Sequence, residues 1–187
     1  IGTPIIQGQN TGIGISTSVG VSIENFVIRQ CTYGVFYYSS TSLTFTRCAI
    51  LDNAYGVTGG NVANDVRFRE CDLSGHNGTA VIPWGRQWEL DRCTLVDNGT
   101  AIWHLAEQLI LRNCIVGNST SVGILSQSGY PQPVLLYNDF YANGVDGDQH
   151  YGAYSPGVND VHVDPQFADQ LGNNFALLPT SPLINAG

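Results

Sequence analysis

Four cysteines recur at almost constant spacing along this chain of 187 residues. They stand at Cys48, Cys71, Cys93 and Cys114 and are separated by 23, 22 and 21 residues. Each lies inside the same apolar pattern, so the chain repeats one structural unit of about 22 residues. A repeat of this length restricts the fold to a stack of similar units, in which residues far apart in sequence become neighbours.

Within each unit the apolar residues alternate, which indicates β-strands. Leu43 and Phe45 are two residues apart, a corner follows, and alternation resumes at Cys48 and Ile50. A third apolar pair follows a turn in each unit. These pairs are Gly12–Ile13, Gly34–Val35, Gly56–Val57, Thr79–Ala80, Ala101–Ile102 and Gly123–Ile124. Three strands that rise roughly 3.3 Å per residue, with their turns, suit one closed coil of a parallel solenoid.

The same alignment can be extended to both ends of the repeat. It places Phe26 at the cysteine position of the first unit and Asp139 at that of the last unit. In the last unit, Val134 then stands opposite Leu109.

The second unit resembles the repeat of the right-handed parallel β-helix (pectin-lyase-like) superfamily. Gly34–Tyr37 matches the first strand of that repeat, and Leu43–Asn53 matches the rest, with Cys48 where the family often stacks asparagines. The superfamily includes pectate lyases, polygalacturonases and many phage tailspikes. The resemblance implies an all-β, single-stranded right-handed parallel β-helix of about seven coils, each of roughly 22 residues and three short strands. Because this fold serves unrelated activities, the resemblance is informative about fold and weak about function.

Two parts of one domain are expected. Residues 1–160 form the coils, and residues 161–187, which resemble the closing segment of secreted bacterial β-helix proteins, form a C-terminal cap. At the other end only residues 1–9 precede the first coil. An uncovered coil exposes strand edges, so self-association through the N-terminal coil is expected.

The cysteine column is expected to consist of buried free thiols. Side chains in register point the same way, which disfavours disulfides between adjacent coils. Four ligands in one straight column cannot surround a tetrahedral zinc ion, and no Cys-x-x-Cys pair occurs. No metal and no cofactor are therefore predicted. Asp146 and Asp148 are similar to a short calcium loop, but the glutamate that completes such a loop is missing, so a plain polar loop is favoured.

Charge excludes some classes of partner. The net charge of −8 and the absence of lysine argue against nucleic-acid binding, and no apolar run reaches the length of a membrane span. Five arginines occupy outward strand positions before the corner; they are Arg47, Arg67, Arg69, Arg92 and Arg112. Opposite charges alternate up the stack, as at Arg47, Glu70 and Arg92, which predicts ion pairs between coils that fix register.

The resemblance does not supply a catalytic site. Lyases of this family bind polysaccharide along the strands that here begin at Gly12, Gly34, Gly56, Thr79, Ala101 and Gly123, and these strands contain no Asp, Glu, Arg or Lys. An alternative lies in the turns, where Asp52 and Asp97 share one position two coils apart. They would stand about 9 to 10 Å from each other, near the separation of carboxyls in inverting glycosidases. Tight turns also recruit aspartate for their own backbone.

The same strands carry aromatic residues. If Val35, Val57, Ala80, Ile102 and Ile124 point inward, the outward column is Phe36, Thr58, Val81, Trp103 and Leu125, with Tyr38 near one end. Phe36, Tyr38 and Trp103 are therefore predicted to contact a sugar or a protein partner. Coverage of this face by a loop or another subunit, and an inverted phase at Trp103, remain open. If Trp103 points outward, its neighbour His104 is expected to face the core and to be hydrogen-bonded.

The sequence thus favours a structural or recognition β-helix module of an extracellular or viral surface protein. Polysaccharide is the favoured partner, bound near Phe36, Tyr38 and Trp103, and no catalytic residue is assigned. The opposing hypothesis is a polysaccharide lyase or glycoside hydrolase that uses Asp52 and Asp97. A third is a piece of a larger enzyme whose active coils lie elsewhere.

Overall fold

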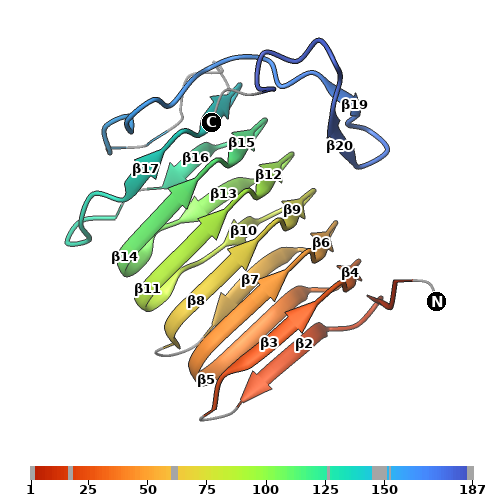
Figure 1. Ribbon diagram of the computed structural model, residues 1–187. Helices are drawn as coiled ribbons and strands as arrows, with labels where there is room; N and C mark the ends of the chain where they lie inside the picture. Colours follow the sequence, from red (N-terminus) through yellow and green to blue (C-terminus); the bar gives the residue numbers. More distant parts are fainter. Residues whose placement is uncertain are drawn as a thin grey trace.

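A computed structural model describes residues 3–16, 19–59, 63–125, 127–144, 151 and 153–184, with the backbone alone at 39–41, 63 and 64. Its strands stack in parallel layers from the first coil at one end to the closing segment at the other (Figure 1). No helix that is long and apolar enough to cross a membrane occurs in the described part of the chain.

The coils build three parallel sheets, named here A, B and C. Sheet A contains β1 (Ile5–Gln7), β4 (Val27–Arg29), β6 (Ala49–Leu51), β9 (Asp72–Ser74), β12 (Thr94–Val96), β15 (Ile115–Gly117) and β18 (Asp139–Tyr141). Sheet B contains β2 (Thr11–Ser16), the first half of β5 (Tyr33–Thr46), β7 (Tyr55–Gly59), β10 (Thr79–Val81), β13 (Thr100–Trp103) and β16 (Val122–Leu125). Sheet C contains β3 (Val21–Glu24), the second half of β5, β8 (Ala63–Arg69), β11 (Trp84–Asp91), β14 (Leu105–Arg112) and β17 (Val134–Leu136).

The all-β parallel solenoid with three strands per coil confirms the predicted fold, but the number of coils is smaller. Among the described residues, six coils contribute a strand to each sheet, whereas about seven were expected. The next coil makes only single bridges, Val158 to Leu136 and Val161 to Asp139. Pro156 and Gly157 precede the first bridge, and both residue types disfavour a continued strand.

Single residues in the left-handed region make two corners of every coil. Between sheets C and A these residues are Asn25, Arg47, Glu70, Arg92, Asn113 and Tyr137, each with φ between 50° and 58°. After sheet A they are Gln30, Asp52, Gly75, Asp97, Asn118 and Ala142, with φ between 48° and 76°. A one-residue corner interrupts the alternation of side chains. This explains why both Phe45 and Cys48 face the core although three positions separate them.

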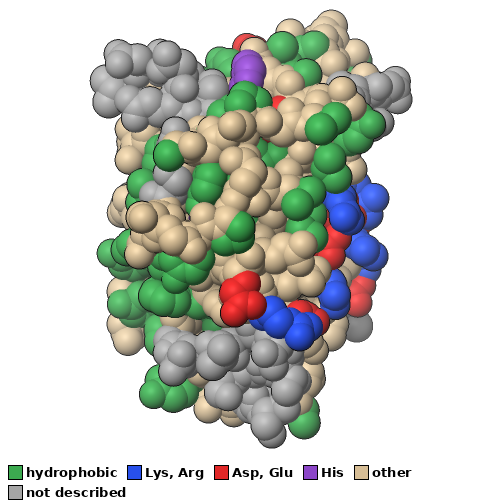
Figure 2. All heavy atoms as spheres, turned by 90° about the vertical axis from the view of Figure 1, so that its left-hand side faces the viewer, with side chains coloured by type: hydrophobic (Ala, Val, Ile, Leu, Met, Phe, Trp, Pro, Cys, Tyr) green, Lys and Arg blue, Asp and Glu red, His purple; other side chains and the backbone are tan. Residues whose placement is uncertain are grey.

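The outer face of sheet C carries the predicted ladder of ion pairs. Arg92 pairs with Glu70 at 3.0 Å, and Arg112 pairs with Glu89 at 2.9 Å across adjacent coils. Figure 2 shows arginine and acidic side chains gathered along one side of the molecule, while hydrophobic side chains spread over the other side. Because the arginines are about half exposed and the carboxylates remain partly exposed, each pair adds at most about 1 kcal/mol, and the main effect of the pairs is on register.

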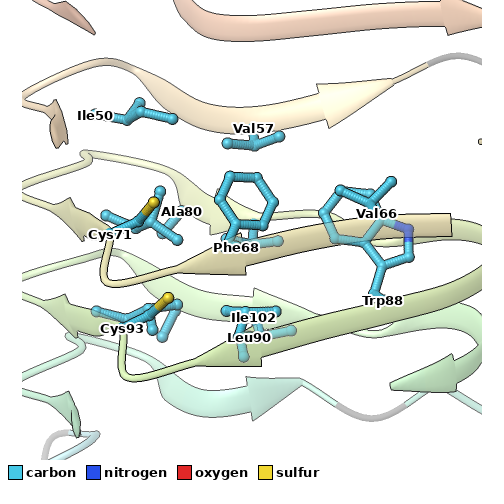
Figure 3. Packing of buried hydrophobic residues seen from close by; sticks show 14 of the residues in the cluster. Ile50, Val57, Val66, Phe68, Cys71, Ala80, Trp88, Leu90, Cys93 and Ile102 are labelled. Carbon is cyan, nitrogen blue, oxygen red and sulfur yellow. The ribbon is translucent and has the colours of Figure 1, made fainter. Parts of the chain in front are cut away.

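The core is a set of stacked columns, and Figure 3 shows part of it. Phe45 and Phe68 stack at 4.7 Å between ring centroids, and Phe68 continues onto Trp88 at 6.0 Å. The cysteine column is buried and all five cysteines are free, as expected. The thiol of Cys114 donates to the carbonyl oxygens of Leu90 and Arg112, so these cysteines act as small core residues.

Two details of the predicted alignment were wrong by one residue. Val134 pairs with Ile110, so Asn138 and not Asp139 occupies the cysteine position of the last coil. Leu135 and Phe140 are the inward residues there, which fixes the register. In sheet B, Val81 pairs with Val57 and is fully buried, so Val81 is not part of the outward column.

A ladder of polar side chains runs inside the corner after sheet A. Asn53 Oδ1 accepts the N–H of Cys31 at 2.9 Å, His76 Nδ1 accepts that of Asn53 at 3.1 Å, and Asn98 Oδ1 accepts that of His76 at 3.0 Å. The amide of Asn98 also donates to the carbonyl of Leu73 at 3.1 Å. The ladder therefore satisfies backbone groups that the buried corners would otherwise leave unpaired.

The closing segment, expected at 161–187, leaves the axis of the solenoid after Val161. It forms the antiparallel pair β19 (Phe167–Asp169) and β20 (Asn174–Leu177), which lies beside sheet A in Figure 1. Ser74 and Val96 point outward from sheet A by alternation, yet both are fully buried. The segment therefore meets the last coil and also runs along the outer face of sheet A.

Replacing Asn98 by alanine should destabilise the protein by about 3 kcal/mol, because two buried backbone groups lose their partners. Urea unfolding followed by circular dichroism measures the change. Asn77→Ala is the matched control, since Asn77 is an exposed asparagine of the neighbouring coil. Equal losses for the two variants would contradict a special role of the ladder.

Candidate functional site

The three aromatic residues predicted to bind a ligand lie on the outer side of sheet B but do not meet. Phe36 pairs with Gly14 and Thr58, and Trp103 pairs with Leu125. Trp103 is outward and Ile102 is fully buried, so the phase assumed for Trp103 is confirmed. Phe36 and Trp103 are three coils apart, which corresponds to about 14 Å along the axis. Trp103 donates instead to Gln127 at 3.2 Å.

Two tyrosines that the sequence analysis missed complete a cluster around Phe36. Tyr33 and Tyr55 stack with 5.6 Å between ring centroids and 17° between planes. Phe36 packs its edge against Tyr33 at 5.7 Å and 65°. Tyr38 lies two residues further along the strand and is 63% exposed. We refer to Tyr33, Phe36, Tyr38 and Tyr55 as the aromatic cluster.

The signal for the two tyrosines was present in the sequence. Tyr33 and Tyr55 are 22 residues apart and share one position of the repeat. Simple alternation assigns Tyr33 the same side as Val35, which is inward. The corner just before the strand turns the tyrosine outward, and only the backbone geometry reveals this.

A polar groove of about 580 Å³ adjoins the aromatic cluster. It follows the corner between sheets A and B over the first coils and is lined by Gly8, Gln9, Asn10, Gln30, Cys31, Thr32, Asp52, Asn53, Ala54 and Asn77. Thr32 and Ala54 line the groove and directly precede Tyr33 and Tyr55, so the groove lies next to the residues that carry the stacked rings. Amide and carboxylate groups beside flat aromatic rings can bind a ligand that has both hydroxyl groups and an apolar face.

The carboxylates of the alternative enzymatic hypothesis lie on one ridge of the molecule. Asp97 accepts two hydrogen bonds from the amide of Gln170, at 2.8 and 3.0 Å, and Asp52 accepts one from Asn173 at 3.4 Å. Both donors come from the turn between β19 and β20. The closing segment therefore occupies the carboxylates that a substrate would have to reach.

A third carboxylate, which the sequence analysis did not single out, lies between these two. Burial raises the pKa of Asp72 to about 7, and the charges of Cys71, Asp52 and Asp97 add to the effect, whereas the Ser74 hydroxyl opposes it. Asp72 occupies an outward strand position, which in the sequence suggests exposure. It is nevertheless only partly exposed, and the closing segment, which the repeat pattern does not predict, is bonded to Asp52 and Asp97 on either side of it.

Two histidines are buried and electrically neutral. Burial lowers the pKa of His76 and of His104 to about 4. His104 Nδ1 lies 2.9 Å from the hydroxyl of Tyr154, which confirms the prediction of a buried, hydrogen-bonded residue. Neither histidine faces the polar groove as a free base, so neither is assigned a catalytic role.

A second cavity, of about 130 Å³, lies where the closing segment meets the last coil. Asp139 is 2% exposed there, and its Oδ1 accepts the N–H of Val163 at 3.0 Å. Burial raises the pKa of Asp139 to about 6. The last coils line this cavity on one side and the closing segment lines it on the other, so we interpret it as a gap in the packing between them.

The described part of the chain contains no group of three or more metal-ligating side chains. Asp146 and Asp148, which resemble a calcium loop, lie outside the described residues. The cysteine column is packed as free thiols.

Comparison with known families agrees with this architecture. A family model described as "Right handed beta helix region" matches residues 11–163. The chain belongs to the right-handed β-helix family. Searches of curated proteins and of solved structures each found no match. For this β-helix the fold is thus shown, and its activity must be argued from its own surface.

The β-helix should become more stable when Asp72 is replaced by asparagine, and the gain should depend on pH. In the folded protein the pKa of Asp72 is raised from 3.8 to about 7. The folded state therefore binds the proton more tightly than the unfolded chain, and stability falls as pH rises between these values. At pH 8 we expect Asp72→Asn to raise the free energy of unfolding by about 2 kcal/mol, and near pH 4 by almost nothing.

Urea unfolding at both pH values measures this effect. Asp65→Asn removes one negative charge from sheet C and serves as the control. A gain for Asp72→Asn that is the same at pH 4 and pH 8 would contradict the assignment.

Proposed function

We propose that this β-helix is a recognition module of an extracellular or viral surface protein that binds polysaccharide on the outer side of sheet B. The observation that supports this most directly is the stack of Tyr33 on Tyr55 at the end of a polar groove. The described strands of sheet B contain no Asp, Glu, Arg or Lys, which favours binding over turnover on this surface.

The chemistry of the surface matches that of a sugar. Aromatic rings offer large, rigid, apolar faces that pack against the C–H face of a pyranose ring. The amides of Gln9, Asn10 and Gln30 can bond to hydroxyl groups in the adjoining groove. Tyr33 and Tyr55 come from adjacent coils, which lie about 4.8 Å apart along the axis, so the stacked rings offer one apolar platform to a polymer that runs along the solenoid. Trp103, further along the same sheet, would be a more distant contact for a longer chain.

Alanine at Tyr33 or Phe36 should weaken the affinity for the bound polysaccharide about tenfold, which corresponds to about 1.4 kcal/mol per ring. Alanine at Trp103 should have a smaller effect and only on long oligosaccharides. Affinity electrophoresis over a polysaccharide panel identifies the ligand, and titration calorimetry measures its affinity. Tyr137→Ala is the control, because Tyr137 is 46% exposed but lies on the corner between sheets C and A.

If a polysaccharide binds the Tyr33→Ala and Phe36→Ala variants as tightly as the wild-type protein, this site is disproved. An assay for reducing ends and unsaturated products over the same panel tests the enzymatic alternative. Turnover that is lost in Asp97→Asn would favour a polysaccharide lyase or glycoside hydrolase with Asp52 and Asp97 instead.

We also propose that the β-helix self-associates through its N-terminal coil. In the described part of the chain, β2 and β3 are hydrogen-bonded to β5 on one side only. Ile13, Val21, Ile23 and Phe26 pack against the core but are only partly buried. A second chain can cover both the strand edges and these apolar side chains.

Light scattering over a range of concentrations should show a mass that rises from one chain toward two. Ile23→Lys should shift the mass toward a single chain, since a buried unpaired charge would oppose association. Val134→Lys, at an exposed position of the opposite end, should not. A wild-type protein that stays monomeric at its highest concentration contradicts this proposal.

A further inference from the structure

We propose that the outer face of sheet C contains an anion-binding site that takes a carboxylate or sulfate group. Arg67 and Arg69 of β8 form it together with Thr44 and Thr46 of β5. These four residues are called the arginine pocket here. It is on a different sheet from the aromatic cluster, so neither site depends on the other.

The register of the strands brings the four side chains together. Arg67 pairs with Thr44 and Arg69 pairs with Thr46 across adjacent coils. The intervening Phe68 is 1% exposed and points inward, so the flanking arginines point outward. A cavity of about 150 Å³ lies between them, and Glu89 and Asp91 of β11 complete its lining.

Arg67 and Arg69 differ from the other arginines of sheet C in how they are bound. Each makes one ion pair, through Nε at 3.5 Å, with Glu89 and Asp91 respectively. Their terminal nitrogens make no hydrogen bond to a described residue. The terminal nitrogens of Arg92 and Arg112, in contrast, donate to Glu70 at 3.0 Å and to Glu89 at 2.9 Å.

Glu89 and Asp91 of β11 do not neutralise the two arginines completely. Glu89 is shared with Arg112 at 2.9 Å, and Asp91 is shared with Arg92 at 3.6 Å. Each carboxylate charge is thus divided between two guanidinium groups. On the side of β5 the cavity is lined by Thr44 and Thr46 and by no carboxylate.

The donors define the class of ligand. Guanidinium groups have only donors, and their planar forks match the oxygen pairs of carboxylate, sulfate and phosphate groups. The threonine hydroxyls add two further donors. Since the protein has a net charge of −8, a long anionic chain would be repelled elsewhere on its surface, and a single anionic substituent is the better fit. A uronate carboxylate or a sulfate ester on a sugar would supply it, and so would a free inorganic anion.

Titration calorimetry at low ionic strength, where exposed charges are least screened, tests the site. The ligands are sodium sulfate, glucuronate and glucose 6-sulfate, with glucose as the uncharged comparison. Binding of all three anions and not of glucose is expected, and the order of affinity distinguishes a sulfate ester, a uronate and a free anion as sources. Shifts of the Arg67 and Arg69 Nε–H resonances on titration report on the wild-type protein directly.

Matched variants separate a built pocket from diffuse attraction. Arg67→Gln and Arg69→Gln should each weaken anion binding about tenfold, as expected for one charge-assisted contact. Arg86 lies on the same sheet but outside the cavity, so Arg86→Gln removes the same charge without touching the pocket. The anion affinity of this variant should stay within about twofold of the wild-type value. Thr44→Val with Thr46→Val keeps the charge and the side-chain shape, and should weaken binding about threefold.

Three results would overturn the proposal. One is a wild-type protein that binds none of the anions or shows no shift at Arg67 and Arg69. Another is an Arg86→Gln variant that loses as much affinity as Arg67→Gln, because attraction would then be diffuse. The third is full affinity for the anions both in the double threonine variant and in the separate Arg67→Gln variant.

Discussion

The register between successive coils is the constraint on which the rest of the structure depends. Backbone hydrogen bonds of all three sheets run along the axis of the solenoid and join each coil to the next in parallel. Residues at one position of the repeat therefore form columns. A slip by one residue would turn the inward columns of Phe45 and Phe68 toward water. The hydrophobic core, the ion pairs and both proposed sites are consequences of this register.

The corners are the second part of the same constraint. A left-handed residue at two corners of each coil lets the chain change direction within one residue, at a cost of about 1 kcal/mol or more for a residue other than glycine. Buried amides compensate for the backbone groups that a corner leaves open. Asn98 does so for His76 and Leu73, and Asn138 does so for Cys114 and Leu111. The cysteines mainly fill space, whereas the buried amides, including Asn138 at the cysteine position of the last coil, satisfy the backbone.

Much of the fold was predictable because the pattern is local and repeated many times. The spacing of the cysteines and the alternation around Phe45 predicted the coils, the buried thiols and the ion pairs. Single-residue errors arose where the repeat is least regular. Val81 and Asn138 were misplaced because the preceding turns differ in length from those of neighbouring coils. Tyr33 and Tyr55 were overlooked because a corner, and not alternation, determines where they point.

The closing segment was the least predictable part. Its contacts with Asp97 and Asp52 join residues 73 and 121 positions apart, and no periodicity links them. Asp72, whose pKa is raised by partial burial, lies in the coil between these two carboxylates. The surfaces proposed as binding sites on sheets B and C, in contrast, consist of stacked positions of the repeat, so the neighbours of each residue can be inferred once the register is known.

The stacking of coils in register is tested most directly by locating the sulfur atoms by anomalous diffraction from crystals. The account predicts that the sulfurs of Cys48, Cys71, Cys93 and Cys114 lie in one row inside the solenoid, with neighbours about 4.8 Å apart. Sulfurs that lie on different sides of the molecule, or on its surface, would contradict it.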